Sequence, residues 1–153
     1  MGVDIHVQRE TTAPPEAVLD TLRETDLERR GRFWSQVKPK YSVVHESGPN
    51  FLDITEGDFS FGLTYERSRY EWSEPGTVAG TVLESNVIKP GSTFVLRASP
   101  RDAGGSLVEL RVRREFWLGP KGRIGATINH LGGGRIFGWY LGTVLKAVEE
   151  ERT

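Results

Sequence analysis

The most restrictive feature of the sequence is a run of six strand-like segments between residues 41 and 116. Turn sequences such as Ser47-Gly48-Pro49-Asn50 separate neighbouring segments. The last segment alternates apolar and charged residues, which is typical of a half-exposed strand. Because parallel strands need long crossover connections, strands joined by short turns predict an antiparallel meander. We expect strands at 41–45, 51–55, 63–72, 77–87, 93–98 and 107–116.

Helices and one further strand flank this run. Residues 3–9 alternate apolar and polar side chains and predict a strand. Residues 11–16, Thr-Thr-Ala-Pro-Pro-Glu, have the capping threonine, prolines and acidic residue of a helix start. A second short helix is expected from residue 27 to about residue 37. The mostly apolar segment 124–148 predicts a long C-terminal helix, the only large element left to cover the sheet.

These elements predict an α+β fold. A curved antiparallel sheet of about seven strands wraps around the long C-terminal helix, with two short helices after the first strand. The length of 153 residues suits one ordinary domain, so we expect a single domain spanning residues 1–153.

Glycine is concentrated in the predicted C-terminal helix, where seven of the eighteen glycines lie between residues 122 and 142. Each costs up to about 1 kcal/mol relative to alanine, so tertiary packing has to hold the helix. Gly134, Gly138 and Gly142 form a stripe that we expect to face the sheet. Such a stripe either leaves room for a ligand or lets two backbones approach closely. The triplet 132–134 predicts a kink, a loosened turn or a break.

Composition excludes several functions. Twenty basic against twenty-one acidic residues argue against a large polyanion-binding surface, so we expect no nucleic-acid partner. The absence of cysteine excludes disulfides, thiolate metal sites and cysteine nucleophiles. The three histidines lack metal-ligand spacing, and the sequence has no GxSxG, P-loop or GxGxxG motif, so we expect neither a metal nor a cofactor.

The same sequence bears on location. Arg135 near the middle of the segment 124–148 makes a transmembrane helix costly, so we expect no stable membrane insertion. The first six residues lack a basic region followed by an apolar run, so we expect no secretory signal and a cytoplasmic protein. The sequence allows both a monomer and a homodimer.

Two short motifs add to the order of elements. Residues 12–18, Thr-Ala-Pro-Pro-Glu-Ala-Val, are similar to an "alanine-proline-x-glutamate-x-valine" helix entry. The ending runs from residues 119–125, Gly-Pro-Lys-Gly-Arg-Ile-Gly, through an apolar helix to residues 145–149, Leu-Lys-Ala-Val-Glu. Over nearly the whole chain this resembles the START-like, helix-grip superfamily (SRPBCC), which includes polyketide cyclases, lipid-transfer proteins and plant pollen-allergen relatives.

That resemblance implies a binding site for a small apolar or amphipathic molecule between the sheet and the last helix. It carries over no catalytic residue, because the superfamily shares no catalytic signature. The side chains that we expect at the site are Trp34, Tyr70, Trp72, Arg114, His130, Phe137 and Tyr140.

Several of these positions carry alternatives. Arg114 shares strand parity with Val112 and points inward unless a bulge turns it out. His130 is either a proton donor or acceptor, or an exposed or capping residue. On the helix, Ile128 and Leu131 are expected near the side that carries Phe137 and Tyr140. His6, His45 and Arg97 are expected to face solvent.

Three functions fit the sequence. The first is a non-catalytic carrier or sensor of a lipid- or polyketide-like molecule. The second is an enzyme of the cyclase or aromatase type, in which His130, Tyr140 or Arg114 assists proton transfer. The third is a protein-interaction module, which would show a large exposed apolar patch.

Overall fold

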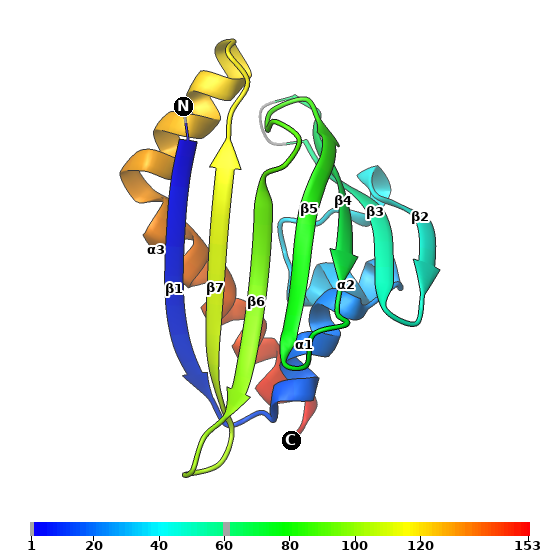
Figure 1. Ribbon diagram of the computed structural model, residues 1–153, viewed down its shortest axis with the longest axis vertical. Helices are drawn as coiled ribbons and strands as arrows, with labels where there is room; N and C mark the ends of the chain where they lie inside the picture. Colours follow the sequence, from blue (N-terminus) through cyan, green and yellow to red (C-terminus); the bar gives the residue numbers. More distant parts are fainter. Residues whose placement is uncertain (1, 60–61) are drawn as a thin grey trace.

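A long helix lies across one face of a curved antiparallel sheet in the computed structural model, which describes residues 2–59 and 62–153 (Figure 1). The order of elements confirms the order predicted from sequence. The elements are β1 (Gly2–Thr11), α1 (Pro15–Arg23), α2 (Leu27–Phe33), a 3-10 turn (Pro39–Tyr41), β2 (Val43–Gly48), β3 (Phe51–Asp58), β4 (Thr64–Glu71), β5 (Thr77–Ser85), β6 (Thr93–Pro100), β7 (Ser106–Glu115) and α3 (Pro120–Glu151).

The sheet is an antiparallel meander that the first strand completes. Across the described part of the chain it has seven strands in the order β1-β7-β6-β5-β4-β3-β2. β1 pairs along its whole length with β7, from Gly2 opposite Glu115 to Thr11 opposite Ser106. In Figure 1, α3 passes behind β1, β7 and β6, while α1 and α2 lie behind the other half of the sheet. The predicted α+β, helix-grip fold class is confirmed.

The core lies between the sheet and α3 because alternate residues of each strand point to that side. Val108, Leu110 and Val112 of β7 are fully buried. They face a core to which α3 contributes Leu141 and Val144, both also buried. Burying one such aliphatic side chain contributes roughly 1.5–3 kcal/mol, so this shared core holds the glycine-rich helix in place.

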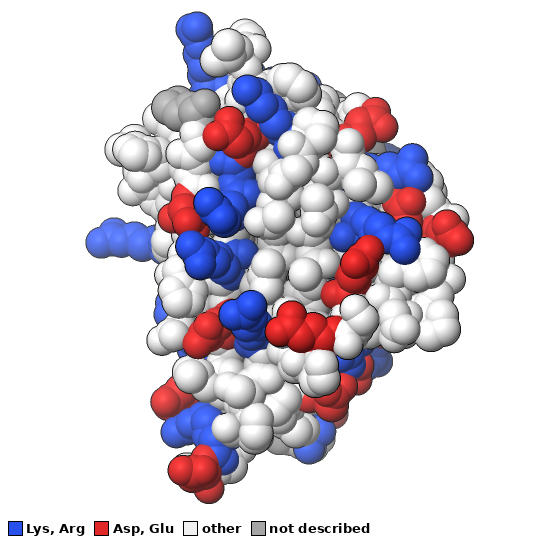
Figure 2. All heavy atoms as spheres, in the orientation of Figure 1, with Lys and Arg blue, Asp and Glu red and all other residues white. Residues whose placement is uncertain are grey.

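The opposite face of the sheet carries charged side chains of both signs (Figure 2). The Arg67 guanidinium donates from Nε and Nη2 to the Asp53 carboxylate at 3.0 and 2.8 Å. This hydrogen bonding holds the pKa of Asp53 below its usual value. Arg97 is exposed on the same face, and His6 and His45 are also exposed, so their predicted orientations toward solvent are confirmed.

Two details of the predicted helices are wrong, and of the three outcomes expected at residues 132–134 the break does not occur. α3 runs without a break through residues 132–134, and α2 ends at Phe33 instead of extending to about residue 37. The predicted glycine stripe does not face the sheet as a unit. A Cβ at Gly138 would meet Arg9 and Val7 of β1, whereas one at Gly134 or Gly142 would meet nothing within 4 Å.

Contacts with β1 explain why the glycine triplet remains helical. Gly133 is buried, and a Cβ there would meet the Ile5 side chain at 2.5 Å. The helix backbone therefore approaches β1 closely at this turn and again at Gly138. At these two glycines the helix backbone packs against side chains of β1. Within the described ranges no helix is both long and apolar enough to cross a bilayer.

Candidate functional site

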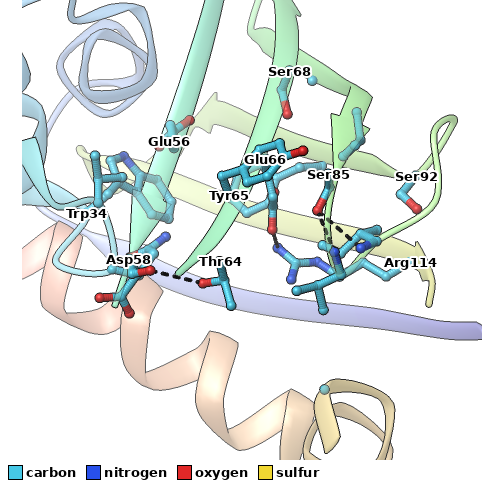
Figure 3. A pocket seen from close by; sticks show the side chains of 18 of the residues that line it. Trp34, Glu56, Asp58, Thr64, Tyr65, Glu66, Ser68, Ser85, Ser92 and Arg114 are labelled. Atoms are coloured by element: carbon cyan, nitrogen blue, oxygen red, sulfur yellow. Dashed lines mark hydrogen bonds and ion pairs between the residues drawn. The ribbon is translucent and has the colours of Figure 1, made fainter. Parts of the chain in front are cut away.

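A cavity of about 360 Å³ lies between the sheet and α3 (Figure 3). Its volume lies in the range of small-molecule sites. Trp34 at one end is 1% exposed and Ile128 at the other is 40% exposed. The cavity is therefore closed at Trp34 and open toward the first turns of α3.

The closed end is built from aromatic side chains. Trp34 follows the last residue of α2 and packs edge-on against Phe94 of β6, with ring centroids 5.5 Å apart. Its indole Nε1 donates to Thr21 Oγ1 at 3.1 Å, so its polar atom is already satisfied within the protein. The Trp34 ring thus presents an apolar wall in a fixed orientation.

An ion pair joins α2 to the cavity-lining residue Glu56. The fully buried Arg30 of α2 donates from Nη2 to Glu56 Oε1 at 3.0 Å and from Nη1 to the Leu22 carbonyl at 2.5 Å. The Tyr70 hydroxyl donates to the same Glu56 oxygen at 3.0 Å, and the Arg30 guanidinium lies 5.0 Å from the Tyr70 ring centroid.

The electrostatics of this cluster keep Tyr70 protonated. Burial raises the pKa of Tyr70 well above its usual value, and the nearby charge of Glu56 adds to that rise. Burial acts most strongly on the pKa of Arg30 and lowers it, but the charges and hydrogen bonds of Glu56 and Tyr70 together outweigh burial, so the net direction is upward. Arg30 therefore stays cationic and Tyr70 stays a hydrogen-bond donor, which fixes the cluster as a structural support.

Arg114 of β7 and Glu66 of β4 form the charged part of the open end (Figure 3). Arg114 Nη2 lies 3.3 Å from Glu66 Oε1, and the guanidinium lies 5.2 Å from the Phe137 ring centroid. Regular pairing of Arg114 with Val3 rules out the bulge that would have turned it outward, so of the two orientations left open by the sequence Arg114 adopts the inward one. Because Arg114 makes one ion-pair contact, to Glu66, some of the five N–H donors of its guanidinium stay available to a ligand.

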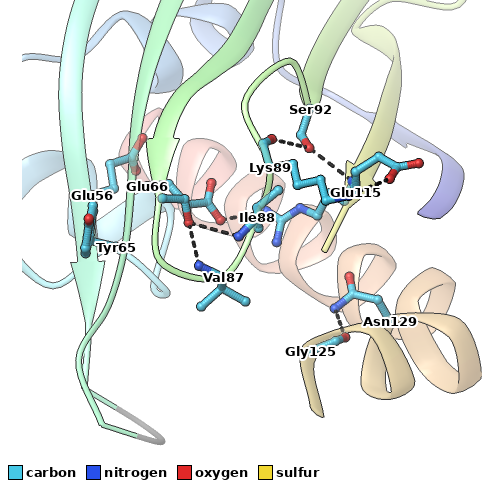
Figure 4. A network of polar contacts seen from close by, with 12 residues as sticks. Glu56, Tyr65, Glu66, Val87, Ile88, Lys89, Ser92, Glu115, Gly125 and Asn129 are labelled. Atoms are coloured by element: carbon cyan, nitrogen blue, oxygen red, sulfur yellow. Dashed lines mark hydrogen bonds and ion pairs between the residues drawn. The ribbon is translucent and has the colours of Figure 1, made fainter. Parts of the chain in front are cut away.

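Two amide side chains in the cavity wall hold oxygens without partners. Asn129 Nδ2 donates to the Gly125 carbonyl at 2.8 Å (Figure 4), which fixes the amide orientation. Asn129 Oδ1 and Gln36 Oε1 are both buried and have no hydrogen-bond partner among the described residues. A buried acceptor without a partner is costly, so these oxygens favour a bound donor.

Two serines of the wall, Ser85 and Ser92, are by contrast used within the fold. Ser85 Oγ, labelled in Figure 3, accepts hydrogen bonds from the backbone N–H groups of Val87 and Ile88, both at 3.1 Å. Ser92 Oγ donates to the Lys89 carbonyl at 2.9 Å and accepts from the Glu115 N–H at 3.1 Å. These two hydroxyls shape the loop between β5 and β6.

Most of the side chains predicted for the site lie together. Trp34, Tyr70, Arg114, Phe137 and Tyr140 all line the cavity, whereas Trp72 and His130 do not.

Local geometry explains the exceptions. Trp72 comes after the end of β4 and donates from Nε1 to the Pro49 carbonyl at 2.9 Å, outside the cavity. His130 is exposed, because one residue along a helix turns the side chain about 100° away from the inward-facing Asn129. Leu131, also expected near this side, is 81% exposed.

Sequence reasoning included Tyr70, Arg114 and Tyr140 but missed other polar residues at the site. Glu66 and Tyr70 are four residues apart on β4, so strand parity was enough to place both on the inner face. Arg30 gave no such signal, because it lies in a run of charged residues that is typical of a solvated helix face. In the described part of the chain, no group of three or more histidine, aspartate or glutamate side chains is placed to hold a metal ion.

Comparisons with known proteins bear on the fold. No family model and no curated protein matches the sequence. Solved structures do match. One is the Zhui aromatase/cyclase from a Streptomyces species, with a TM-score of 0.75, 14% identity, and coverage of 100% of this chain and 97% of that one.

Two further structures agree with it. The protein TTHA0849 from Thermus thermophilus has a TM-score of 0.78 at 15% identity, covering 99% of this chain and 100% of the other. A START superfamily protein from Mycobacterium smegmatis has a TM-score of 0.63 at 12% identity, covering 98% and 95%. Identities this low establish the architecture alone. The chain has a START-like, helix-grip fold with a cavity between its sheet and its C-terminal helix.

Proposed function

We propose that the protein binds one small amphipathic molecule in the cavity, as a carrier or sensor of a lipid- or polyketide-like compound. The observation that carries this proposal is a cavity of about 360 Å³ that combines aromatic walls with unpartnered acceptor oxygens. Sites for small molecules have this composition, apolar over most of their surface with a few polar groups that fix orientation.

The polar groups indicate which ligand chemistry fits. Asn129 Oδ1 and Gln36 Oε1 are acceptors that lack a donor in the described structure. A ligand with hydroxyl or phenol groups supplies such donors, and its apolar body packs against Trp34 and Phe94. Arg114 offers the complementary group, a cation beside Phe137 that accommodates a ligand carbonyl or carboxylate.

The experiment is a titration with a polarity-sensitive apolar fluorophore, followed by displacement with hydroxylated aromatic and acyl compounds. Ser68 lines the cavity and is buried, so Ser68→Phe places a ring in the binding space. Thr81→Phe adds the same ring on the exposed face of the adjacent strand β5 and is the matched control. We expect saturable binding by the parent protein and by Thr81→Phe, and at least tenfold weaker binding by Ser68→Phe. Equal binding by all three proteins would refute the cavity as the site.

A cyclase or aromatase activity is the second candidate, and the placement of two side chains favours it. Arg114 and Tyr140 line the same cavity, and both lie near Phe137, whose ring centroid is 5.2 Å from the Arg114 guanidinium and 6.2 Å from the Tyr140 ring centroid. The Tyr140 hydroxyl has no hydrogen-bond partner among the described residues, so it is available to a ligand. His130 does not line this cavity.

This second candidate predicts turnover. Incubation with a linear polyketone analogue would yield a cyclised product detectable by mass spectrometry and absorbance. Tyr140→Phe and Arg114→Gln would then lower the rate while fluorophore affinity changes by less than about threefold. Binding without any product formation would leave the carrier or sensor function and exclude this one for the analogue tested.

A further inference from the structure

The outward side of α3 carries an exposed stripe of apolar and basic side chains. The members recur every three or four residues and therefore share one helix face over about 27 Å. Leu131 is 81% exposed and Trp139 is 63% exposed, which is unusual for side chains of this size. The α3 stripe consists of Lys121, Ile124, Ile128, Leu131, Arg135 and Trp139, all exposed.

The charge of this region has one sign. Between residues 116 and 148 the sequence contains no aspartate or glutamate, but it contains Lys121, Arg123, Arg135 and Lys146. Within residues 2–59 and 62–153, Arg123, Arg135 and Lys146 have no ion-pair partner. The outer face of the sheet differs, because its arginines alternate with acidic residues (Figure 2). A helix with exposed apolar residues and unpaired cations of one sign is typical of segments that lie on anionic lipid surfaces.

The stripe also borders the open end of the cavity. Ile128 belongs to both, since it lines the cavity and is 40% exposed on the stripe. The neighbouring residues Gly125 and Asn129 line the cavity as well. A surface that covers the stripe would therefore meet the cavity opening, and an apolar ligand could pass between the two without crossing water.

From this arrangement we propose that the α3 stripe docks the protein on the surface of an anionic lipid bilayer. Leu131 and Trp139 enter the boundary between headgroups and acyl chains, and Arg135 pairs with lipid phosphates. A second copy of the chain is a poor occupant, because two such stripes would bring Lys and Arg against Lys and Arg with no carboxylate between them. The proposal goes beyond ligand binding and does not depend on it.

Vesicle co-sedimentation tests the proposal directly. The full chain is mixed with vesicles of phosphatidylcholine alone and with vesicles that also contain about one third phosphatidylserine. We expect binding to the anionic vesicles that falls as salt is raised, because exposed charges are screened. Arg135→Gln should weaken this binding by about fivefold, and Leu131→Gln by roughly tenfold.

Matched controls lie on the outer face of the sheet. Arg97→Gln removes an exposed cation of β6, and Leu83→Gln removes an exposed leucine of β5. Both controls should bind like the parent protein, and all four variants should keep the parent's circular dichroism and melting temperature because the changed side chains are exposed. No binding to anionic vesicles, equal binding to neutral vesicles, or equal losses in the controls would overturn the proposal.

Self-association is tested in the same preparations. Sedimentation equilibrium of the parent protein should give a species that Leu131→Gln and Trp139→Gln leave unchanged. A dimer that these two variants dissociate would assign the stripe to a homodimer interface and overturn lipid docking. Fluorophore affinity measured without vesicles is a separate readout, so loss of docking and loss of ligand binding are distinguishable.

Discussion

Replacing Glu56 by glutamine tests the electrostatic account of the closed end of the cavity. The change keeps the shape of the side chain but leaves the fully buried Arg30 guanidinium without its carboxylate. Removing one partner of a buried ion pair costs roughly 3–5 kcal/mol. Because glutamine can still accept from Arg30 and Tyr70, and because Glu56 is partly open to the cavity, we expect about 2–3 kcal/mol.

The assay is urea unfolding followed by tryptophan fluorescence, supported by scanning calorimetry. At roughly 2–4 °C per kcal/mol for a chain of this size, the melting temperature of Glu56→Gln should fall by roughly 5–10 °C. Glu66→Gln is the matched control, because Glu66 lines the same cavity but contacts the more exposed Arg114 at 3.3 Å. It should cost less than about 1 kcal/mol. Equal losses of stability from the two substitutions would refute the claim that the Glu56 carboxylate supports the fold and the Glu66 carboxylate does not.

Further predictions concern stability. Because Arg67 lowers the folded-state pKa of Asp53, this pair stabilises the fold above the unfolded-state pKa, near 3.9, and the contribution is lost as the pH falls through the lower folded value. Asp53→Asn should therefore cost about 1 kcal/mol at pH 7, and urea unfolding at a pH below the folded value should show no difference from the parent. Gly134→Ala should raise the free energy of unfolding by up to about 1 kcal/mol, since a Cβ there meets nothing within 4 Å. Gly122→Ala should lower the free energy of unfolding, since a Cβ there would overlap the Trp117 carbonyl. If urea unfolding showed Gly122→Ala to be more stable than Gly134→Ala, the packing described for α3 would be contradicted.

The fold followed from the sequence because strand alternation and short turns restrict topology strongly. The inward orientation of Arg114 followed from the same alternation, through its shared parity with Val112. The helical triplet 132–134 did not follow, because local propensity opposes it and the contact between Gly133 and Ile5, far apart in the sequence, decides it. The pairing of Arg30 with Glu56 was equally hidden, since the two residues come from different elements and only the folded chain brings them together.

The most direct test of the central claim is native mass spectrometry of the protein purified from its own cells. The account predicts a single bound species with one ligand per chain, soluble in organic solvent and bearing hydroxyl or phenol groups. Thr81→Phe should retain that species and Ser68→Phe should lose it. A parent protein that carries no ligand, and takes none up from a lipid and polyketide extract, would contradict the assignment of the cavity as a binding site.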